Sequence, residues 1–164
     1  MRRFTFYDTD SAGDVDYDIS GKEYEQLLEL CFRYGHTCSV LLDLNEPKTA
    51  YPFSCIDQYR IPVTDCVRNV YRHYGYFEKD THNGYEIRHY LLCADVQKVI
   101  RNVTDSINKW LCGWGYSNPA DPAFYREDGS VFFYSLVHEG VCMIEANSEE
   151  NIDSILTGGL WRSV

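Results

Sequence analysis

The chain has 164 residues, of which 45% are apolar, 15% are aromatic and seven are cysteine, and its formal net charge is −10 at pH 7. A chain of this length can bury a sizeable core, and this composition is typical of one globular domain rather than a disordered protein. The sequence has no apolar run near the ~18 residues needed to cross a bilayer. Its odd cysteine count, without a Cys-x-x-Cys pair, favours free thiols over disulfides or a zinc knuckle. We therefore expect a single domain over 1–164 in the reducing cytoplasm.

The first half of the chain predicts alternating strands and helices. Ser20 and Glu23 have the Ser-x-x-Glu spacing of a capping box, which satisfies two amides at the start of a helix. Apolar residues from Tyr24 to Cys31 follow at helical spacing, and Gly35 can end that helix. In chain order we expect a strand at 3–7, an aspartate-rich loop, a helix at 20–35, a strand at 38–44, an irregular loop at 45–62 and a helix after Thr64.

The second half of the chain predicts a long helix and a C-terminal meander of three strands. Apolar residues from Val96 to Leu111 trace one helical stripe. Glycine follows Asp128 and Glu139, where it supplies the positive φ that tight hairpins require. In chain order we expect a strand at 85–93, a helix at 95–111, the meander at 123–146 and a short helix at 149–156.

The order of these elements predicts the fold class. The middle run of the meander, 131–137, is apolar on both faces, so we expect it in the centre of a sheet. Strands and helices alternate as β-α-β-α-β-α-β-β-β-α. This order predicts an α+β fold, with a largely antiparallel sheet and three to four helices packed on one of its faces.

The acidic residues are concentrated in two segments of the chain. Residues 8–29 and 121–153 each carry eight acids and one base, a net charge of −7, whereas 30–120 is nearly neutral. A protein with this charge should avoid nucleic acid and favour basic surfaces. We expect the two segments to converge on one face, where they would form a single electronegative surface.

The first segment contains the run FYDTDSAGDVDYD, with five aspartates. A calcium loop of the EF-hand type needs a glycine at its sixth position and an oxygen ligand at its twelfth. A register that starts at Asp14 ends correctly at Glu25 but has Ile19 at the sixth position, and a register from Asp8 has Ile19 at the twelfth. A solvated loop before a helix explains Asp18 through the helix dipole, but it does not explain five neighbouring aspartates.

The same run resembles the start of the haloacid-dehalogenase-type phosphatases, in which a strand is followed by Asp-x-Asp. The resemblance rests on FTFYD and Asp10, and it implies Asp8 as a nucleophile, Asp10 as a general acid and magnesium beside them. Ala12 stands where that family has Thr or Val, and the chain lacks the alternating βαβ pattern of such a fold. A divalent-metal enzyme that uses Asp8 and Asp10 is one alternative hypothesis.

No cysteine–histidine pair in the chain is accompanied by a nucleophile elbow or a Gly-rich phosphate loop. We therefore predict no catalytic residue, no metal site and no cofactor. We interpret the acidic segments as a surface for a basic protein, because carboxylates pair well with Arg and Lys side chains. The residues predicted to bind the partner are Asp8, Asp10, Asp14, Asp16, Tyr17, Asp18, Glu127, Asp128, Glu149 and Glu150.

In size, acidity, its 14 tyrosines and the lack of catalytic motifs, the whole chain resembles the small inhibitors carried by phages and mobile elements. Anti-CRISPR and anti-restriction proteins are examples of this class. The resemblance implies a non-enzymatic inhibitor, of the nucleic-acid-mimicking kind, that blocks a basic nucleic-acid-handling protein such as a CRISPR effector or a nuclease. It implies no direct contact with nucleic acid or membrane. Immunity proteins that neutralise nuclease toxins are similar in the same respects and form the second alternative.

Overall fold

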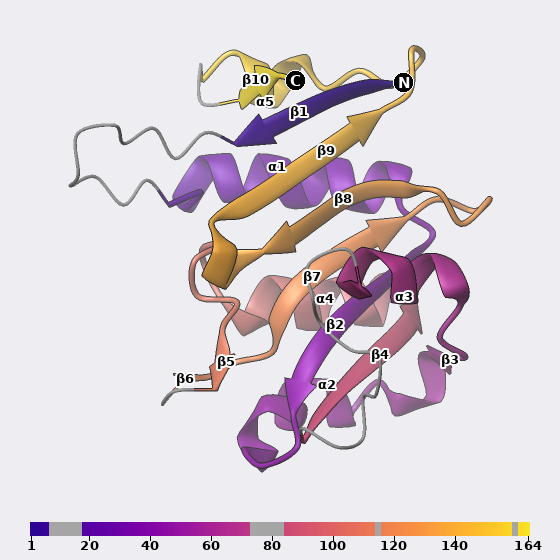
Figure 1. Ribbon diagram of the computed structural model, residues 1–164, viewed down its shortest axis with the longest axis vertical. Helices are drawn as coiled ribbons and strands as arrows, with labels where there is room; N and C mark the ends of the chain where they lie inside the picture. The colour runs from indigo at the N-terminus through magenta and orange to yellow at the C-terminus, as the bar shows by residue number, and fades with distance from the viewer. Residues whose placement is uncertain (7–17, 73–83, 114–115, 159–160) are drawn as a thin grey trace.

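The computed structural model describes residues 1–6, 18–72, 84–113, 116–158 and 161–164. Its main feature is a sheet of eight strands in the order β10-β1-β9-β8-β7-β2-β4-β3, in which every pair of neighbours is antiparallel (Figure 1). The strands are β1 (Arg2–Phe6), β2 (Thr37–Asp43), β3 (Arg60–Ile61), β4 (Tyr85–Leu91), β7 (Ala120–Tyr125), β8 (Val131–Leu136), β9 (Val141–Ala146) and β10 (Trp161–Ser163). A separate small hairpin is formed by β5 (Cys112–Gly113) and β6 (Tyr116–Ser117). The predicted α+β fold with a largely antiparallel sheet is confirmed.

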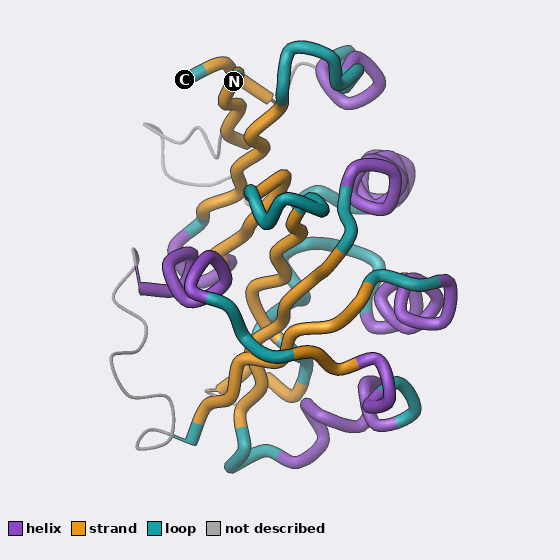
Figure 2. The backbone as a smooth tube through the Cα atoms, turned by 90° about the vertical axis from the view of Figure 1, so that its right-hand side faces the viewer, coloured by secondary structure: helices purple, strands orange, loops and turns teal. Residues whose placement is uncertain are grey.

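Helices cover both faces of this sheet (Figure 2). Four of the described helices, α1, α2, α4 and α5, lie on one face. Three of these were predicted, whereas the predicted helix after Thr64, which is α3, lies on the other face. The bounds are α1 (Gly21–Tyr34), α2 (Tyr51–Ser54), α3 (Asp65–Arg72), α4 (Ala94–Val103) and α5 (Asp153–Leu156), with 3-10 turns η1 (Pro47–Ala50), η2 (Asp57–Tyr59) and η3 (Val137–Glu139). Among the described residues, no helix is long and apolar enough to cross a membrane.

The predicted C-terminal meander is present as β7, β8 and β9. Gly129 and Gly140 occupy the two turns with φ of +80° and +66°, which are values that glycine adopts without strain. Strand β8 lies inside the sheet between β7 and β9, as its two apolar faces predict. The short helix expected at 149–156 is present as α5, although it begins only at Asp153.

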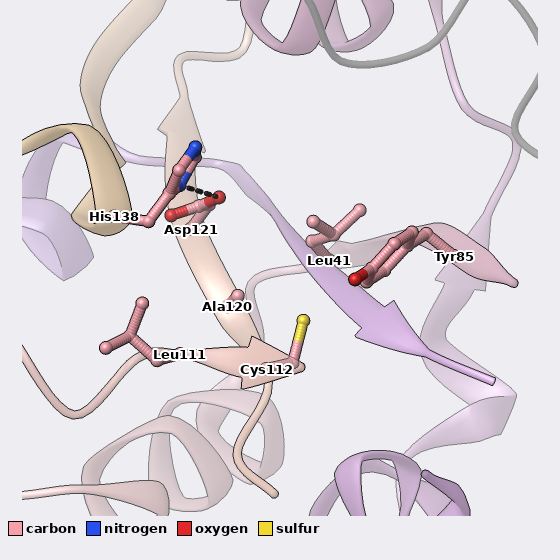
Figure 3. A pocket seen from close by; sticks show the side chains of 7 residues that line it. All are labelled: Leu41, Tyr85, Leu111, Cys112, Ala120, Asp121 and His138. Atoms are coloured by element: carbon pink, nitrogen blue, oxygen red, sulfur yellow. Dashed lines mark ion pairs between the residues drawn. The ribbon is translucent and has the colours of Figure 1, made fainter. Parts of the chain in front are cut away.

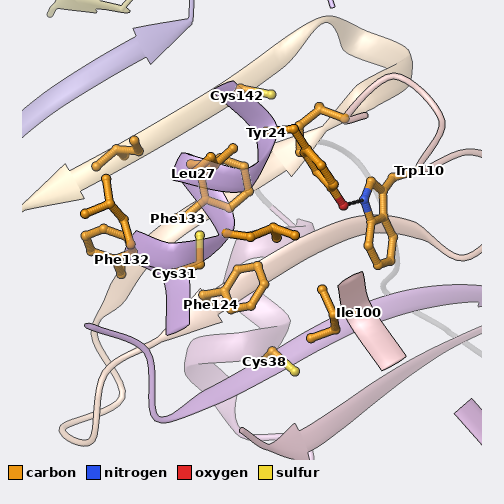
Figure 4. Close-up of a cluster of buried hydrophobic side chains, with 14 of the residues drawn as sticks. Tyr24, Leu27, Cys31, Cys38, Ile100, Trp110, Phe124, Phe132, Phe133 and Cys142 are labelled. Carbon is orange, nitrogen blue, oxygen red and sulfur yellow. Dashed lines mark hydrogen bonds between the residues drawn. The ribbon is translucent and has the colours of Figure 1, made fainter. Parts of the chain in front are cut away.

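The larger core lies between the sheet and α1. Apolar side chains at helical spacing on α1, including Tyr24, Leu27 and Cys31, are almost fully buried, which confirms the predicted stripe (Figure 4). Trp110 donates a hydrogen bond from its ring nitrogen to the hydroxyl of Tyr24 at 2.9 Å (Figure 4). Burial raises the pKa of the Cys31 thiol well above its usual range, so that thiol packs as a small neutral core residue.

The helix predicted at 95–111 is too long, because α4 ends at Val103. Thr104 has an extended backbone, and its hydroxyl donates to the carbonyl of Ser106 at 2.9 Å. The chain then pairs with the segment before α1, where the amide of Ile107 donates to the carbonyl of Ile19 at 3.0 Å. The stripe of apolar residues therefore predicted burial correctly, but local and tertiary hydrogen bonds replace the last helical turns.

Other sequence predictions also differ from the structure. Ser20 is the residue before α1, but its side chain makes no capping hydrogen bond, so the predicted capping box is not formed. The segment 45–62, predicted as irregular, contains η1, α2, η2 and β3. Strands β3, β5, β6 and β10 were not predicted, because two or three residues are too few to show an alternating pattern.

The Tyr24–Trp110 contact predicts a specific loss of stability. In Tyr24→Phe the buried ring N–H of Trp110 would lose its acceptor, which costs about 1–3 kcal/mol in the free energy of unfolding. Chemical denaturation monitored by tryptophan fluorescence measures this loss. Tyr51→Phe is the matched control, because Tyr51 is 68% exposed, and its unfolding should match the wild type. Equal stability of the two variants would contradict the assigned role of this bond.

Candidate functional site

Several predicted partner-binding residues meet at one end of the sheet. Tyr125 pairs with Val131, and Phe133 pairs with Ile144, so the turn after β7 and the loop after β9 lie at the same end (Figure 1). We call residues 126–130 and 147–150 together the hairpin end. Its exposed carboxylates belong to Glu127, Asp128 and Glu149.

A buried ion pair holds the two parts of the hairpin end together. Arg126 donates from Nε and Nη2 to the two carboxylate oxygens of Glu150, at 2.6 and 2.7 Å. Glu150 also accepts from the amide of Asn147 at 2.7 Å. Burial alone would raise the pKa of Glu150, but the bonds from Arg126 and Asn147 outweigh burial and the pKa is lowered. Glu150 therefore stays ionised in a structural pair, and its carboxylate is not available to a partner as the sequence predicted.

The turn itself is ordered by Asp128. Its Oδ1 accepts from the hydroxyl of Ser130 at 2.6 Å and from the amide of Ser130 at 2.9 Å, and these bonds lower the pKa of Asp128. Gly129 completes the turn in the left-handed region. The side chains of Glu127 and Asp128 are thus presented from a defined turn rather than from a loose loop.

An open groove of about 530 Å³ lies beside this turn, between α3 and the strands β8, β9 and β1. Val70, Val131, Tyr134 and Met143 contribute its larger apolar side chains, and Gly129 and Ser130 of the turn line its edge. Glu145 lines the groove as well, and it pairs with Arg3 at 3.1 Å. Arg3 lines the groove too, so the groove combines an apolar wall with one ion pair and the edge of the acidic turn.

The first acidic segment does not join this surface where the structure describes it. Asp18 precedes α1 and accepts from the amide of Asn108 at 2.9 Å. Helix α1 then runs along the sheet, so its 14 residues separate Asp18 from the hairpin end by roughly 20 Å (Figure 1). Asp8, Asp10, Asp14, Asp16 and Tyr17 lie outside the described residues. The expected convergence of the two segments is therefore wrong for Asp18 and the hairpin end.

A second candidate site lies at the other end of β7. Ser39 pairs with Ala123 and Leu41 pairs with Ala120, so Asp121 and Pro122 together stand opposite Val40. This two-against-one arrangement is a β-bulge, and Pro122 has no amide to offer to a strand ladder. Asp121 is the only described non-glycine residue with positive φ, at +51°, a conformation that aspartate tolerates better than most residues.

Hydrogen bonds hold Asp121 in this conformation. Its backbone carbonyl accepts from the hydroxyl of Tyr71 at 3.0 Å, and its Oδ1 accepts from the amide of Val137 at 2.8 Å. The hydroxyl of Ser39 bridges Tyr71 and Tyr125 at 3.0 and 2.9 Å, which ties α3 to β7. These bonds fix the carboxylate in a buried position, since only 1% of Asp121 is exposed.

The carboxylate of Asp121 lines a small cavity of about 130 Å³ (Figure 3). Its Oδ2 lies 3.9 Å from Nδ1 of His138, which is beyond hydrogen-bond distance, and Nε2 of His138 lies 3.3 Å from Glu139. Apolar and aromatic side chains from β2, β4, the β5 region and β7 also line it. Those that the structure describes are Leu41, Tyr85, Leu111, Cys112 and Ala120. We call this site the Asp121 cavity.

The buried setting changes the acid–base chemistry of the Asp121 cavity. Burial raises the pKa of Asp121 to about 7, against the opposing bond from Val137, and the nearby charge of Glu139 raises it further. Burial also raises the pKa of Cys112 to about 12, with Asp121 as the next cause. Cys112 is therefore protonated at neutral pH and is not an activated nucleophile. Asp121 can exchange a proton near pH 7.

A metal centre is not formed by the side chains that the structure describes. Within the described ranges, no three His, Cys, Asp or Glu side chains are grouped so that they could hold a metal ion. The alternative hypothesis of a divalent-metal enzyme depends on Asp8 and Asp10, which lie outside those ranges. The prediction that the chain has no metal site therefore stays a prediction.

No protein-family model matches the chain, and neither a curated protein nor a solved structure matches it. The arguments about function therefore rest on the geometry of the hairpin end and of the Asp121 cavity.

Sequence reasoning missed the Asp121 cavity entirely. Pro122 between two strand-forming stretches was an available indication, because proline inside a sheet is confined to edges and bulges. The distance along the chain from Asp121 to His138 gives no indication that the two side chains meet. Only the pairing of β7 with β8, followed by η3, brings them together.

The buried pair at the hairpin end predicts strong energetic coupling. Glu150→Leu would leave the charge of Arg126 buried without compensation, which costs about 3–5 kcal/mol in the free energy of unfolding. The double variant Arg126→Met, Glu150→Leu removes both charges, so it should be more stable than the single variant. A double-mutant cycle by chemical denaturation measures the coupling. Additive losses would contradict a buried pair.

The raised pKa of Asp121 predicts a pH-dependent stability. The unfolded chain releases this proton near pH 3.9, whereas the folded chain releases it only near pH 7. The free energy of unfolding should therefore fall as the pH rises from about 3.9 to about 7, and it should stay constant above pH 7. The loss from this one group is roughly 4 kcal/mol. Asp121→Asn keeps an oxygen acceptor for Val137 and tolerates the positive φ, so it should lack this part of the decline.

Urea unfolding of wild type and Asp121→Asn at pH 4, 6 and 8 measures the difference between them. Asp105→Asn is the matched control, because the Asp105 side chain is 77% exposed. A constant difference between wild type and Asp121→Asn from pH 4 to 8 would show that Asp121 ionises normally in the folded protein.

Proposed function

We propose that this protein is a non-enzymatic inhibitor that binds and blocks a basic, nucleic-acid-handling protein through the hairpin end and the adjoining groove. The observation that carries the proposal is the buried pair of Arg126 and Glu150, which fixes the acidic turn beside an open apolar groove. Glu127, Asp128 and Glu149 are the residues expected to contact the partner.

The distribution of charge supports a basic partner. The formal net charge of −10 attracts cationic surfaces over a distance of about 10 Å at moderate salt and raises the rate of encounter. The exposed carboxylates of the hairpin end can then pair with Arg or Lys side chains. Nucleic-acid-binding grooves are rich in these cations, and a protein with this charge would itself be repelled by phosphates.

The shape of the groove supports a protein rather than a nucleic acid as the occupant. Protein interfaces have an apolar centre enriched in aromatic residues and methionine, with a polar rim. Tyr134, Met143 and Val131 provide such a centre, and the 126–130 turn and Glu145 provide the rim. The proposed occupant is therefore a basic segment with at least one apolar side chain.

The rigid support of the acidic turn favours inhibition over loose attraction. Asp128 is already ordered by Ser130, and Arg126 is already bound to Glu150, so little conformational freedom would be lost on binding. An anti-defence inhibitor of the anti-CRISPR kind and an immunity protein would use such a surface in the same way. The identity of the bound partner, a defence effector or a nuclease toxin, distinguishes these two versions.

The test is affinity capture of partners from the native host with wild-type protein and two triple variants. Glu127, Asp128 and Glu149 are changed to lysine in the first, and Glu29, Glu46 and Asp105, which are exposed elsewhere, are changed to lysine in the second. Both variants change the net charge equally. The first should weaken binding by about tenfold or more, because attraction becomes repulsion, and the second should bind nearly as wild type does.

The captured protein is then tested for binding to its own nucleic acid with and without wild-type protein. We expect wild-type protein to displace the nucleic acid, and the hairpin-end variant to fail at the same concentration. Equal loss of binding in both triple variants would reduce the effect to net charge and refute this surface. A captured protein that binds no nucleic acid would refute the proposed partner class.

A further inference from the structure

We propose that the Asp121 cavity is a binding site for a small organic cation, a primary ammonium group carried on a short apolar body. This site is separate from the proposed partner surface, because Asp121 stands at the start of β7 and the hairpin end follows the last residue of that strand. The inference therefore does not depend on the proposed function.

The polar end of the cavity contains an incompletely paired carboxylate. The Oδ1 atom of Asp121 is taken by the amide of Val137, whereas no hydrogen bond to Oδ2 is present among the described residues. Among the described side chains, Nδ1 of His138 lies 3.9 Å from that oxygen. A buried carboxylate is unfavourable without a hydrogen-bonded positive partner, so an ammonium group at this position would supply a partner that the described residues do not.

The remainder of the cavity suits a compact apolar body. Leu41, Leu111 and Ala120 present carbon atoms, and the protonated thiol of Cys112 adds no charge (Figure 3). The ring of Tyr85 adds an aromatic face that favours a cation nearby. The volume of about 130 Å³ is similar to that of an engineered protein cavity that binds benzene, which limits the ligand to about six non-hydrogen atoms.

The strained backbone conformation of Asp121 also indicates a binding site. A bulge with a non-glycine residue at positive φ costs free energy, and such conformations cluster at binding sites. Here the bulge turns the carboxylate toward the cavity while Tyr71 fixes the carbonyl of the same residue. A plain strand at this position would need neither the conformation nor the buried charge.

The ionisable groups around Asp121 make the binding depend on pH. Ionisable side chains from η3, β5, β4, α3 and β9 face Asp121. They are His138, Glu139, Cys112, Tyr85, Tyr71 and Cys142. Asp121 changes charge near pH 7, so the fraction that can pair with an ammonium group rises about tenfold from pH 6 to pH 8.

The experiment is an NMR titration of the full chain with three probes of similar size and different charge. Isobutylamine is the cation, isobutanol is the neutral probe and isobutyrate is the anion. We expect the amine to bind most tightly of the three, with millimolar affinity or better, which is reasonable for a ligand of five non-hydrogen atoms. Its binding should shift the amide resonances of Asp121 and Val137. Its affinity should rise about tenfold from pH 6 to pH 8.

Two variants separate this proposal from non-specific binding. Asp121→Asn should weaken amine binding at pH 8 by about tenfold or more and should leave isobutanol binding unchanged, because the cavity keeps its shape. Asp105→Asn removes an exposed carboxylate elsewhere and should bind the amine as wild type does. No amine binding to folded wild type, or equal binding of amine and alcohol, or equal amine binding to Asp121→Asn, would overturn the proposal.

Discussion

Burial of β7 on both faces is the constraint on which the rest of this structure depends. All six residues of the strand are buried, and from Ala123 to Tyr125 the side chains alternate between the two cores. Phe124 points to the core shared with α1, where its ring meets that of Phe32 at 6.1 Å. Tyr125 points to the core shared with α3 and donates to or accepts from Ser39. Polar groups at the ends of such a strand are shielded from water, so their hydrogen bonds must be made within the protein.

The two ends of β7 meet this requirement in opposite ways. At the C-terminal end Arg126 finds a complete partner, because both oxygens of Glu150 and a ring face of Phe132 surround its guanidinium group. At the N-terminal end, the described residues offer Asp121 one amide donor and a histidine that is too far away for a hydrogen bond. The first end is therefore a fixed support for whatever lies on its surface. At the second end one carboxylate oxygen has no hydrogen bond from the described residues, and a ligand that supplies such a bond would gain affinity.

The parts of the fold that follow regular patterns could be predicted from sequence. The amphipathic stripe of α1, the two glycine turns and the doubly apolar strand β8 each result from local constraints that a linear pattern expresses. The end of α4 could not be predicted, because Ile107 and Trp110 continue the helical stripe while Ile19 and Tyr24 supply the competing bonds. Those partners are more than 80 residues away along the chain. Propensity is a weak guide when tertiary bonds of this kind are available.

The candidate sites show the same division. The sequence indicated Glu127, Asp128 and Glu149 as surface carboxylates, and all three are exposed. It gave no reason to separate them from Glu150, since neighbouring glutamates look alike until one meets Arg126 in space. It also grouped Asp18 with them by net charge alone, although α1 holds that residue at the far end of the sheet. Counting acidic residues along the sequence predicts the net charge, but only the fold shows on which surface the exposed carboxylates lie.

The dielectric environment explains why the two ends of β7 should respond to different variables. The carboxylates of Glu127, Asp128 and Glu149 are exposed, so dissolved salt screens their attraction for a partner beyond a Debye length of about 10 Å. The carboxylate of Asp121 is shielded by protein on nearly all sides, so salt reaches it poorly and protons govern its charge instead. Salt should therefore tune contacts at one end of the molecule and pH should tune the other.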